Sequence, residues 1–478
     1  MEDETQVMLS FTTRLPPELQ VPATEVAVPA SLKRYGMSQI INHLLALEPA
    51  RPFDFIIDGE LLRKSLQQHL LEHDISPELV VEVEYVPAVV PPEPKSALPQ
   101  DDWVTAVAAV SQGGSLASGA ADGVVRLWSS SGDCVLEFSA HKQGINALAS
   151  VAAAAGQQQQ QQQPSLLLSA GKDHAVRLWQ LPAGVDVQQQ QAGEASEASH
   201  SSGSSTLARC AVVYKGHKEA VQSVAVSPGS SMCCSGGWDG QLLLWRTGQQ
   251  VLDEATNGAT PEAVEDAAAA AGTRKKRKVG SAAANGTAAA AAAIELEAVA
   301  ALPGHVHCVS ALTWPESGTV YSGGWDHSVR RYDVETRINT DTYNGSKAVY
   351  AVAAPAAADA EAGASSSSSS SSSIVAIGGA DRVLRIWDTR SSKGEALAVR
   401  AYNAHEGWIS CIAWRPGSAH QLATGGHDGA VKVWDVRSGV PLGSLAQHEQ
   451  KVLCVGWLGQ RQLVSGGADC KLQLYDMP

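Results

Sequence analysis

The chain has 478 residues, an ordinary hydrophobic content of 44% and a net charge of −14 at pH 7. This length exceeds the roughly 150 residues of one ordinary domain, so we expect several domains or a repeat architecture, and the negative charge argues against binding nucleic acid over the whole surface. No apolar run approaches the roughly 20 residues that cross a bilayer, and the acidic N-terminus does not resemble a secretory signal, so we expect a soluble intracellular protein.

Residues 6–86 follow a short tail (1–5) that we expect to be disordered, and they carry mixed strand and helix patterns. Alternating apolar residues predict a strand over 6–14, and an apolar face predicts a helix over 37–47 with Ser38 as its capping residue. Further patterns predict a strand over 53–58, a helical stretch over 61–72 and a last strand over 79–85. This order resembles the ubiquitin-like β-grasp, an α+β fold.

From residue 101 to the C-terminus, one short phrase recurs seven times: small residues, an Asp, and an apolar strand that ends in an aromatic residue six positions after the Asp. The copies occupy 118–128, 169–179, 235–245, 322–332, 377–387, 424–434 and 465–475. Each copy predicts two strands joined by a tight turn, and a further apolar strand lies upstream. The pattern resembles the WD-repeat family, so the expected fold is mostly β: a seven-bladed WD40 β-propeller over 101–478.

In the WD-repeat family, a His, a Ser or Thr, the turn Asp and the Trp form a buried hydrogen-bond chain. Three repeats match all four positions, namely His141, Ser169, Asp173 and Trp179; His217, Ser235, Asp239 and Trp245; and His405, Thr424, Asp428 and Trp434. Tyr replaces Trp in the fourth and seventh repeats, while Ser346 in the fifth and Gln100 in the first stand in place of His, so we expect those blades to be less rigid.

The repeated Ser, His and Asp residues could also be interpreted as a hydrolase triad. Because these residues recur at equivalent positions in the repeats, where they would hold the strands together, we favour the structural interpretation and expect no enzyme activity. The eight cysteines are scattered and contain no Cys-x-x-Cys pair, so neither a zinc site nor a disulfide framework is predicted. No cofactor is expected.

Residues 87–100 are rich in proline and are predicted to be a linker and a closing strand. Alignment of the repeats places Lys95–Leu98 where the fourth strand of the last blade belongs, so we expect this segment to complete that blade. Low-complexity insertions at 152–164, 183–207, 247–297 and 355–373 are expected to be disordered. All four fall in loops that leave one face of an antiparallel meander.

The opposite face carries aromatic candidates for a protein interface: Trp103, Trp238, Trp325 and Trp408. Local packing of each indole against its own hairpin is the alternative. Five consecutive cations, Arg274, Lys275, Lys276, Arg277 and Lys278, lie in the longest insertion and are typical of a nuclear-import signal. A weak RNA contact or a solubilising charge are the alternatives.

Residues 55–62 (FIIDGELL), 11–16 (FTTRLP) and 32–36 (LKRYG) resemble an N-terminal domain of the NLE type, and the resemblance continues through 101–104 (DDWV) and the propeller. The family is the WD-repeat subunit of the Pescadillo–Bop–WD-repeat (PeBoW) complex. The resemblance implies a nucleolar and nucleoplasmic scaffold of the pre-60S ribosomal particle, needed for maturation of its rRNA. Its propeller would bind the Bop-type subunit, and Pescadillo would join through that subunit.

The resemblance also implies that midasin, an AAA ATPase, binds the ubiquitin-like domain and removes the complex. In the family, a Glu of this domain completes the coordination of Mg²⁺ in the partner's adhesion site, and the motif assigns that role to Glu78, with Asp74 as the alternative. Two other functions remain open at this point: a Notchless-type factor, which would carry an eighth repeat, and a substrate receptor of a ubiquitin ligase.

Overall fold

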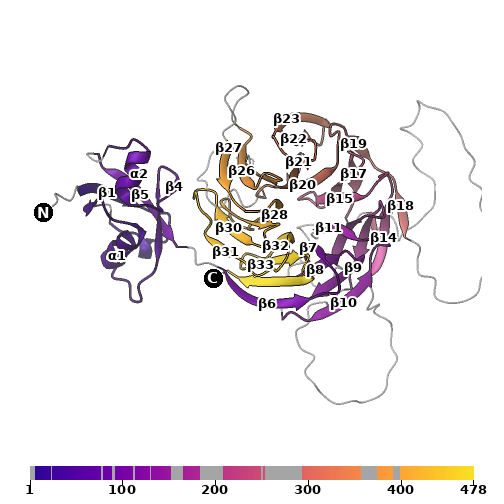
Figure 1. The fold of residues 1–478 in the computed structure, drawn as a ribbon, viewed down its shortest axis with the longest axis horizontal. Helices are drawn as coiled ribbons and strands as arrows, with labels where there is room; N and C mark the ends of the chain where they lie inside the picture. The colour runs from indigo at the N-terminus through magenta and orange to yellow at the C-terminus, as the bar shows by residue number, and fades with distance from the viewer. Residues whose placement is uncertain are drawn as a thin grey trace, which may run out of the picture. The chain divides into compact units, whose positions relative to one another are not determined.

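The computed structural model describes residues 6–22, 24–76, 79–88, 92–110, 114–129, 131–151, 165–182, 208–248, 251–252, 293–356, 374–390 and 399–477. The chain divides into two compact units. One comprises Thr105–Ser346, and the other comprises Met1–Val104 together with Lys347–Pro478. Figure 1 shows the strands that dominate both units, coloured from indigo at the N-terminus to yellow at the C-terminus.

The N-terminal domain is a five-stranded sheet in the order β2-β1-β5-β3-β4. Its elements are β1 (Gln6–Thr12), the short 3-10 helix η1 (Pro17–Leu19), β2 (Glu25–Pro29), α1 (Arg34–Leu44), β3 (Phe53–Ile57), β4 (Glu60–Leu61), α2 (Leu66–Glu72) and β5 (Val81–Pro87). β1 and β5 run parallel, and the other pairs are antiparallel. Alternate residues of β1, Val7, Leu9 and Phe11, are buried with Met37 and Ile41 of α1, which explains the apolar periodicities of both segments. The predicted β-grasp is confirmed.

The structure corrects two predicted features of this domain and adds a strand that was not predicted. α1 begins at Arg34 with Lys33 as its N-cap, so the capping role predicted for Ser38 is wrong. Its first turn is partly exposed and therefore shows no apolar periodicity, while Ser38 lies inside the helix and its Oγ accepts a hydrogen bond from the Phe53 backbone N–H at 3.0 Å. The predicted helical stretch 61–72 contains β4 and then α2, which starts only after Ser65. β2 was not predicted, because its apolar alternation is short and ends at a proline.

The unit Thr105–Ser346 contains four β-sheets, each built on a four-stranded meander. The first has β7 (Val104–Val110), β8 (Ser115–Ala120), β9 (Val124–Trp128) and β10 (Cys134–Ser139), and the second has β11 (Ile145–Val151), β12 (Leu166–Gly171), β13 (Val176–Gln180) and β14 (Arg209–Tyr214). The third has β15 (Val221–Val226), β16 (Met232–Gly237), β17 (Leu242–Arg246) and β19 (Ala300–Leu302), and the fourth has β20 (Val309–Glu316), β21 (Thr319–Gly324), β22 (Ser328–Asp333) and β23 (Ile338–Asn344).

The other unit contains three further sheets of the same design beside the β-grasp domain. They comprise β24 (Val349–Ala353), β25 (Ile374–Gly379), β26 (Val383–Asp388) and β27 (Val399–Asn403); β28 (Ile409–Trp414), β29 (Gln421–Gly426), β30 (Val431–Asp435) and β31 (Gly443–Leu445); and β32 (Val452–Leu458), β33 (Gln462–Gly467), β34 (Lys471–Asp476) and β6 (Glu93–Pro99). The described residues thus form the seven blades of a WD40 β-propeller, as the repeat count predicts, and we number them 1 to 7 in the order given above.

The last blade is completed by an early segment of the chain. β6 pairs with β34 in antiparallel register, from Lys471 opposite Pro99 to Asp476 opposite Glu93. The fourth-strand position predicted for Lys95–Leu98 is therefore confirmed, and the strand extends two residues further on its N-terminal side and one on its C-terminal side. Its prolines are tolerated because its outer side is a sheet edge.

The paired glycines in most of the repeated phrases serve two different contacts. In blade 6, a Cβ on Gly425 would lie 2.6 Å from Cys411 Sγ and 2.7 Å from Val452 Cγ1 of the next blade. A Cβ on Gly426 would meet the side chains of Asp428 and His405. The first glycine thus permits close packing of neighbouring blades, and the second leaves room for the polar residues of its own blade.

Part of one predicted insertion is ordered. Val251 and Leu252 are buried in a hydrophobic cluster, and β18 (Ile294–Leu296) pairs in parallel with β14, so the expectation of disorder throughout 247–297 is wrong at these residues. The apolar side chains at 251, 252, 294 and 296 explain why they pack although their flanks are polar or small. The insertions 152–164 and 183–207 lie outside the described residues, as does the insertion 355–373 except for Pro355 and Ala356.

Candidate interaction surface

Three buried hydrogen-bond chains join the residues that the sequence assigns to structural tetrads. In blade 2, His141 Nδ1 lies 2.7 Å from Asp173 Oδ1, His141 Nε2 lies 2.7 Å from Ser169 Oγ, and Trp179 Nε1 donates to the same oxygen at 2.9 Å. The corresponding distances are 3.1, 2.7 and 2.8 Å in blade 3, and 3.0, 2.8 and 3.0 Å in blade 6. The third chain belongs to His405, Thr424, Asp428 and Trp434.

Burial and hydrogen bonding shift the pKa values of His141 and Asp173 in the blade 2 chain. Burial lowers the pKa of His141, against the opposing effect of the Asp173 hydrogen bond. Burial alone would raise the pKa of Asp173, but its hydrogen bonds and charge interactions with His141 and Arg177 outweigh this effect and lower the pKa. A neutral His141 imidazole can then donate a hydrogen bond from Nδ1 to the Asp173 carboxylate and accept one from the Ser169 hydroxyl at Nε2. Ser169 Oγ in turn accepts a hydrogen bond from the Trp179 indole N–H. Every polar side-chain atom of this chain thus has a hydrogen-bond partner.

These pKa shifts predict that acid weakens the fold. The pKa of His141, His217 and His405 lies below the ordinary 6.5 in the folded chain, so the unfolded chain binds more protons as the pH falls below 6.5. Each such His should cost up to about 1.4 kcal/mol of unfolding free energy per pH unit there. The low pKa of Asp173 adds a second loss below about pH 4. Urea midpoints measured from pH 8 to pH 4 should be flat above pH 7 and fall below it, whereas a constant midpoint down to pH 5 would refute the neutral-His assignment.

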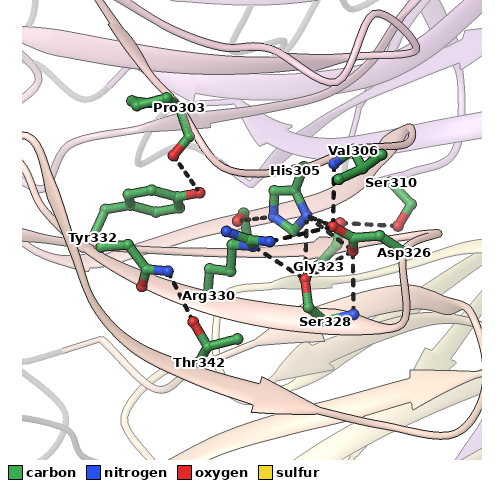
Figure 2. A network of polar contacts seen from close by, with 12 residues as sticks. Pro303, His305, Val306, Ser310, Gly323, Asp326, Ser328, Arg330, Tyr332 and Thr342 are labelled. Atoms are coloured by element: carbon green, nitrogen blue, oxygen red, sulfur yellow. Dashed lines mark hydrogen bonds and ion pairs between the residues drawn. The ribbon is translucent and has the colours of Figure 1, made fainter.

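Blades 4 and 7 hold a nearly equivalent network although Tyr replaces Trp. Figure 2 shows His305 beside Asp326 and near Ser328 in blade 4. His305 Nδ1 lies 2.9 Å from Asp326 Oδ2, and its Nε2 lies 2.6 Å from Ser322 Oγ. The Tyr332 hydroxyl donates instead to the Pro303 carbonyl at 3.4 Å. In blade 7, the hydroxyl of Tyr475 lies 3.2 Å from Ser465 Oγ. The Tyr residues therefore change only the aromatic hydrogen bond of the network, which goes to Pro303 in blade 4 and is longer in blade 7. The hydrogen bonds between His, Asp and Ser are kept.

An arginine four residues after the turn Asp is a further part of these networks that the sequence reasoning missed. Arg177 Nη1 lies 2.8 Å from Asp173 Oδ2, and Arg126 Nη2 lies 3.1 Å from Asp122 Oδ2. Arg330 and Arg385 pair with Asp326 and Asp381 in the same way. In blade 1, which has Gln100 in place of His, Trp128 still donates to Ser118 Oγ at 2.8 Å. The recurring Arg within the third strand was the available signal.

The buried hydroxyls cannot meet a substrate. Ser169, Ser235 and Thr424 are 0% exposed, and each accepts an indole N–H in addition to its contact with His. A nucleophile must reach its substrate, so these His–Asp–Ser sets are suited to holding the blade and not to hydrolysis. Among the described residues, no group of three or more His, Cys, Asp or Glu side chains could hold a metal ion.

The four candidate tryptophans remain exposed beside these networks. Trp238 and Trp325, each directly before a turn Asp in adjacent blades, are 46% and 38% exposed, and their rings lie 5.1 Å apart. Each backbone N–H donates to the loop before its own first strand, at Ala220 O and Cys308 O respectively. The two indoles thus form one aromatic patch, while the Trp238 Nε1–H also donates to Gln222 Oε1 of its own blade at 3.1 Å.

In the other unit, Trp408 is 45% exposed and lies between two aromatic rings. Its centroid is 5.6 Å from that of Tyr350 and 5.4 Å from that of His427. Trp103 is 52% exposed, and its backbone N–H is bound by Asp102. Half-exposed indoles at the turn side of the blades are the kind of residue that anchors protein interfaces.

Several predicted functional residues lie outside the described residues: Glu78 and the basic run Arg274, Lys275, Lys276, Arg277 and Lys278. Asp74, the alternative to Glu78, is exposed in the turn after α2 and has a positive φ of 53°. None of the helices in the described part of the chain is long and apolar enough to span a membrane.

Comparison with known families agrees with this architecture. Residues 7–70 match the profile of the NLE (NUC135) domain, and the WD domain, G-beta repeat profile matches 93–129, 132–180, 208–246, 296–333, 397–435 and 439–476. These six matches leave out residues 338–388, which contain β23–β26. A long Ser tract (365–373) interrupts the repeat pattern in this stretch. The structure supplies the missing repeat there as blade 5, formed by β24–β27.

Relatives resemble the chain over nearly its whole length. A protein of Chlamydomonas reinhardtii named "Ribosome biogenesis protein WDR12 homolog" is 46% identical over 493 residues, covering 100% of this chain and 99% of that protein. The protein of the same name in Oryza sativa subsp. japonica is 36% identical, covering 98% and 95%. "Ribosome biogenesis protein YTM1" of Vanderwaltozyma polyspora is 31% identical, covering 99% and 97%. With its NLE domain and WD repeats, the chain belongs to the WDR12/YTM1 family of ribosome biogenesis proteins.

Proposed function

We propose that the chain is a non-catalytic scaffold in the maturation of the large ribosomal subunit and of its pre-60S rRNA. The observation that carries this proposal is the full-length similarity to proteins named for ribosome biogenesis. The architecture supports it, because the recurring polar residues are buried in the blades and the exposed residues at the turns are aromatic anchors. A protein built in this way works through the partners that it holds.

The aromatic turn surface is the proposed contact for the Bop-type WD-repeat protein, through which Pescadillo joins. Trp238 and Trp325 form its strongest part, because two touching indoles offer a large apolar area at a small cost in side-chain entropy. A partner propeller is itself a rigid surface, and rigid surfaces pair with little loss of conformational freedom.

The ubiquitin-like domain is the proposed binding site for midasin, the AAA ATPase that removes the complex from the particle. Glu78 is the proposed ligand to Mg²⁺ in the partner's adhesion site, since a carboxylate oxygen suits a hard cation with one open position. The basic run 274–278 is proposed to direct nuclear import, which fits work in the nucleolus and nucleoplasm.

Co-purification in the presence and absence of Mg²⁺ tests this proposal. A tagged full-length chain should recover the ATPase with Mg²⁺ present, and chelation of Mg²⁺ or the substitution Glu78→Ala should reduce recovery at least 100-fold. Asp74→Ala is the matched control, because it removes a neighbouring exposed carboxylate. The Bop-type subunit and Pescadillo should be recovered in every case.

Two outcomes would contradict the assignments. Recovery of the ATPase with Glu78→Ala but not with Asp74→Ala would reassign the metal ligand. Recovery of a cullin adaptor in place of ribosomal precursors would favour a substrate receptor of a ubiquitin ligase. A Notchless-type factor is disfavoured, because the described residues form seven blades and the cited relatives carry the WDR12 and YTM1 names.

A further inference from the structure

The free edge of the β-grasp sheet contacts a turn of blade 6 within the same compact unit. β4 is the last strand in its sheet, and its Leu61 backbone N–H donates to the Arg437 carbonyl at 2.9 Å. Arg63 Nε, just after β4, donates to Ser438 Oγ at 3.4 Å. Arg400 Nη1 lies 3.8 Å from Glu60 Oε1 at the border of the contact. The sheet edge is therefore covered by the chain's own propeller.

Blade 4 provides an equivalent turn for comparison. Blades 4 and 6 form the same turn after their third strand, closed by a bond from Glu335 N–H to Asp333 Oδ1 at 3.0 Å and from Arg437 N–H to Asp435 Oδ1 at 2.9 Å. Thr336 of the first turn is exposed, whereas the matching Ser438 of the second is 1% exposed. Blade 6 buries this serine at the point where Arg63 reaches it.

Both sides of the contact present an arginine that is held by an aspartate of its own domain. Arg63 Nη1 lies 3.3 Å from Asp54 Oδ1, and Arg437 donates to Asp435 through Nε at 2.9 Å and Nη2 at 2.8 Å. Arg63 Nη2 is buried without a hydrogen-bond partner among the described residues. A contact that is polar and incompletely satisfied is suited to separate again, since water can replace its hydrogen bonds.

The position of this contact in the chain suits it to bear part of a force applied to the β-grasp domain. β5 ends at Pro87, and β6, which completes the last blade, begins at Glu93. A load on the β-grasp domain would therefore act on the strand that closes blade 7. A second attachment at blade 6 shares that load and keeps the domain in one place.

We propose that β4 and the turn Arg437–Ser438 form a reversible latch that docks the β-grasp domain on blade 6 of its own propeller. The docked state orients the domain and shields its sheet edge from other strands. Release separates the domain from blade 6. The latch stands independently of the identity of any partner, so its test does not depend on the proposed function.

Amide hydrogen exchange on the full-length chain tests the latch at Leu61, because this N–H points out of its own sheet to Arg437 O. The substitution Ser438→Lys places a second cation and a long side chain against Arg63. We expect the Leu61 amide to exchange at least tenfold faster in this variant, and small-angle X-ray scattering to show a larger radius of gyration. Thr336→Lys, the same change in the equivalent exposed turn of blade 4, should alter neither quantity.

Arg63→Met provides the second variant, since it removes the contact from the other side and should give the same rise in exchange if Ser438→Lys fails to fold. Fast exchange of Leu61 in the unaltered chain, or unchanged protection in both Ser438→Lys and Arg63→Met, would overturn the latch. An equal increase in Thr336→Lys would also overturn it, because the effect would then arise from loosening of the propeller.

Discussion

A chain that lacks residues 1–99 should melt about 5 °C below a chain that lacks only residues 1–91. The longer deletion removes β6 and leaves β34 without its outer neighbour along the register from Lys471 to Asp476. If each lost backbone hydrogen bond contributes about 1 kcal/mol, the loss is on the order of 3–5 kcal/mol, which corresponds to roughly that change in melting temperature. The exposed edge should also promote aggregation.

The shorter deletion is the matched control for this prediction. It removes the same β-grasp domain, together with any contact that the domain makes, but retains β6. Differential scanning calorimetry and light scattering on both truncated chains measure the two effects. Equal melting temperatures would show that β6 does not close the last blade.

The repeat architecture could be predicted from the sequence because it depends on a fixed number of residues between two positions of each repeat. The turn Asp and the aromatic residue six positions later recur in all seven blades, and tertiary packing cannot change that interval. The closing strand followed from alignment of the units, since an incomplete last blade needs a fourth strand. The tetrad residues could be named for the same reason.

Other features depend on contacts between residues that are far apart in the chain. The capping role of Ser38 was wrong because the first turn of α1 is partly exposed and leaves no mark in the apolar pattern. The pairing of Trp238 with Trp325 required the spacing of adjacent blades, and the contact of Leu61 with Arg437 joins residues that no periodicity relates. β18 was missed because three residues in a low-complexity stretch carry too little pattern.

The double substitution Trp238→Ala and Trp325→Ala should release the chain from ribosomal precursors without unfolding it. Removing two central aromatic anchors from a protein interface typically costs more than 2 kcal/mol each, so the fraction bound should fall at least 100-fold. The free energy of unfolding should change far less than on truncation of a core residue, because both indoles are partly exposed. Ile338→Ala, which truncates an exposed apolar side chain in blade 4, is the matched control.

Gradient sedimentation of the tagged full-length chain from growing cells tests the central claim, that this family member acts as a scaffold held on precursors of the large ribosomal subunit. The unaltered chain and Ile338→Ala should migrate with those precursors, and the double tryptophan variant should remain near the top of the gradient with an unchanged melting temperature. An unaltered chain that stays at the top, or a double variant that still migrates with the precursors, would contradict the scaffold and its aromatic contact surface respectively.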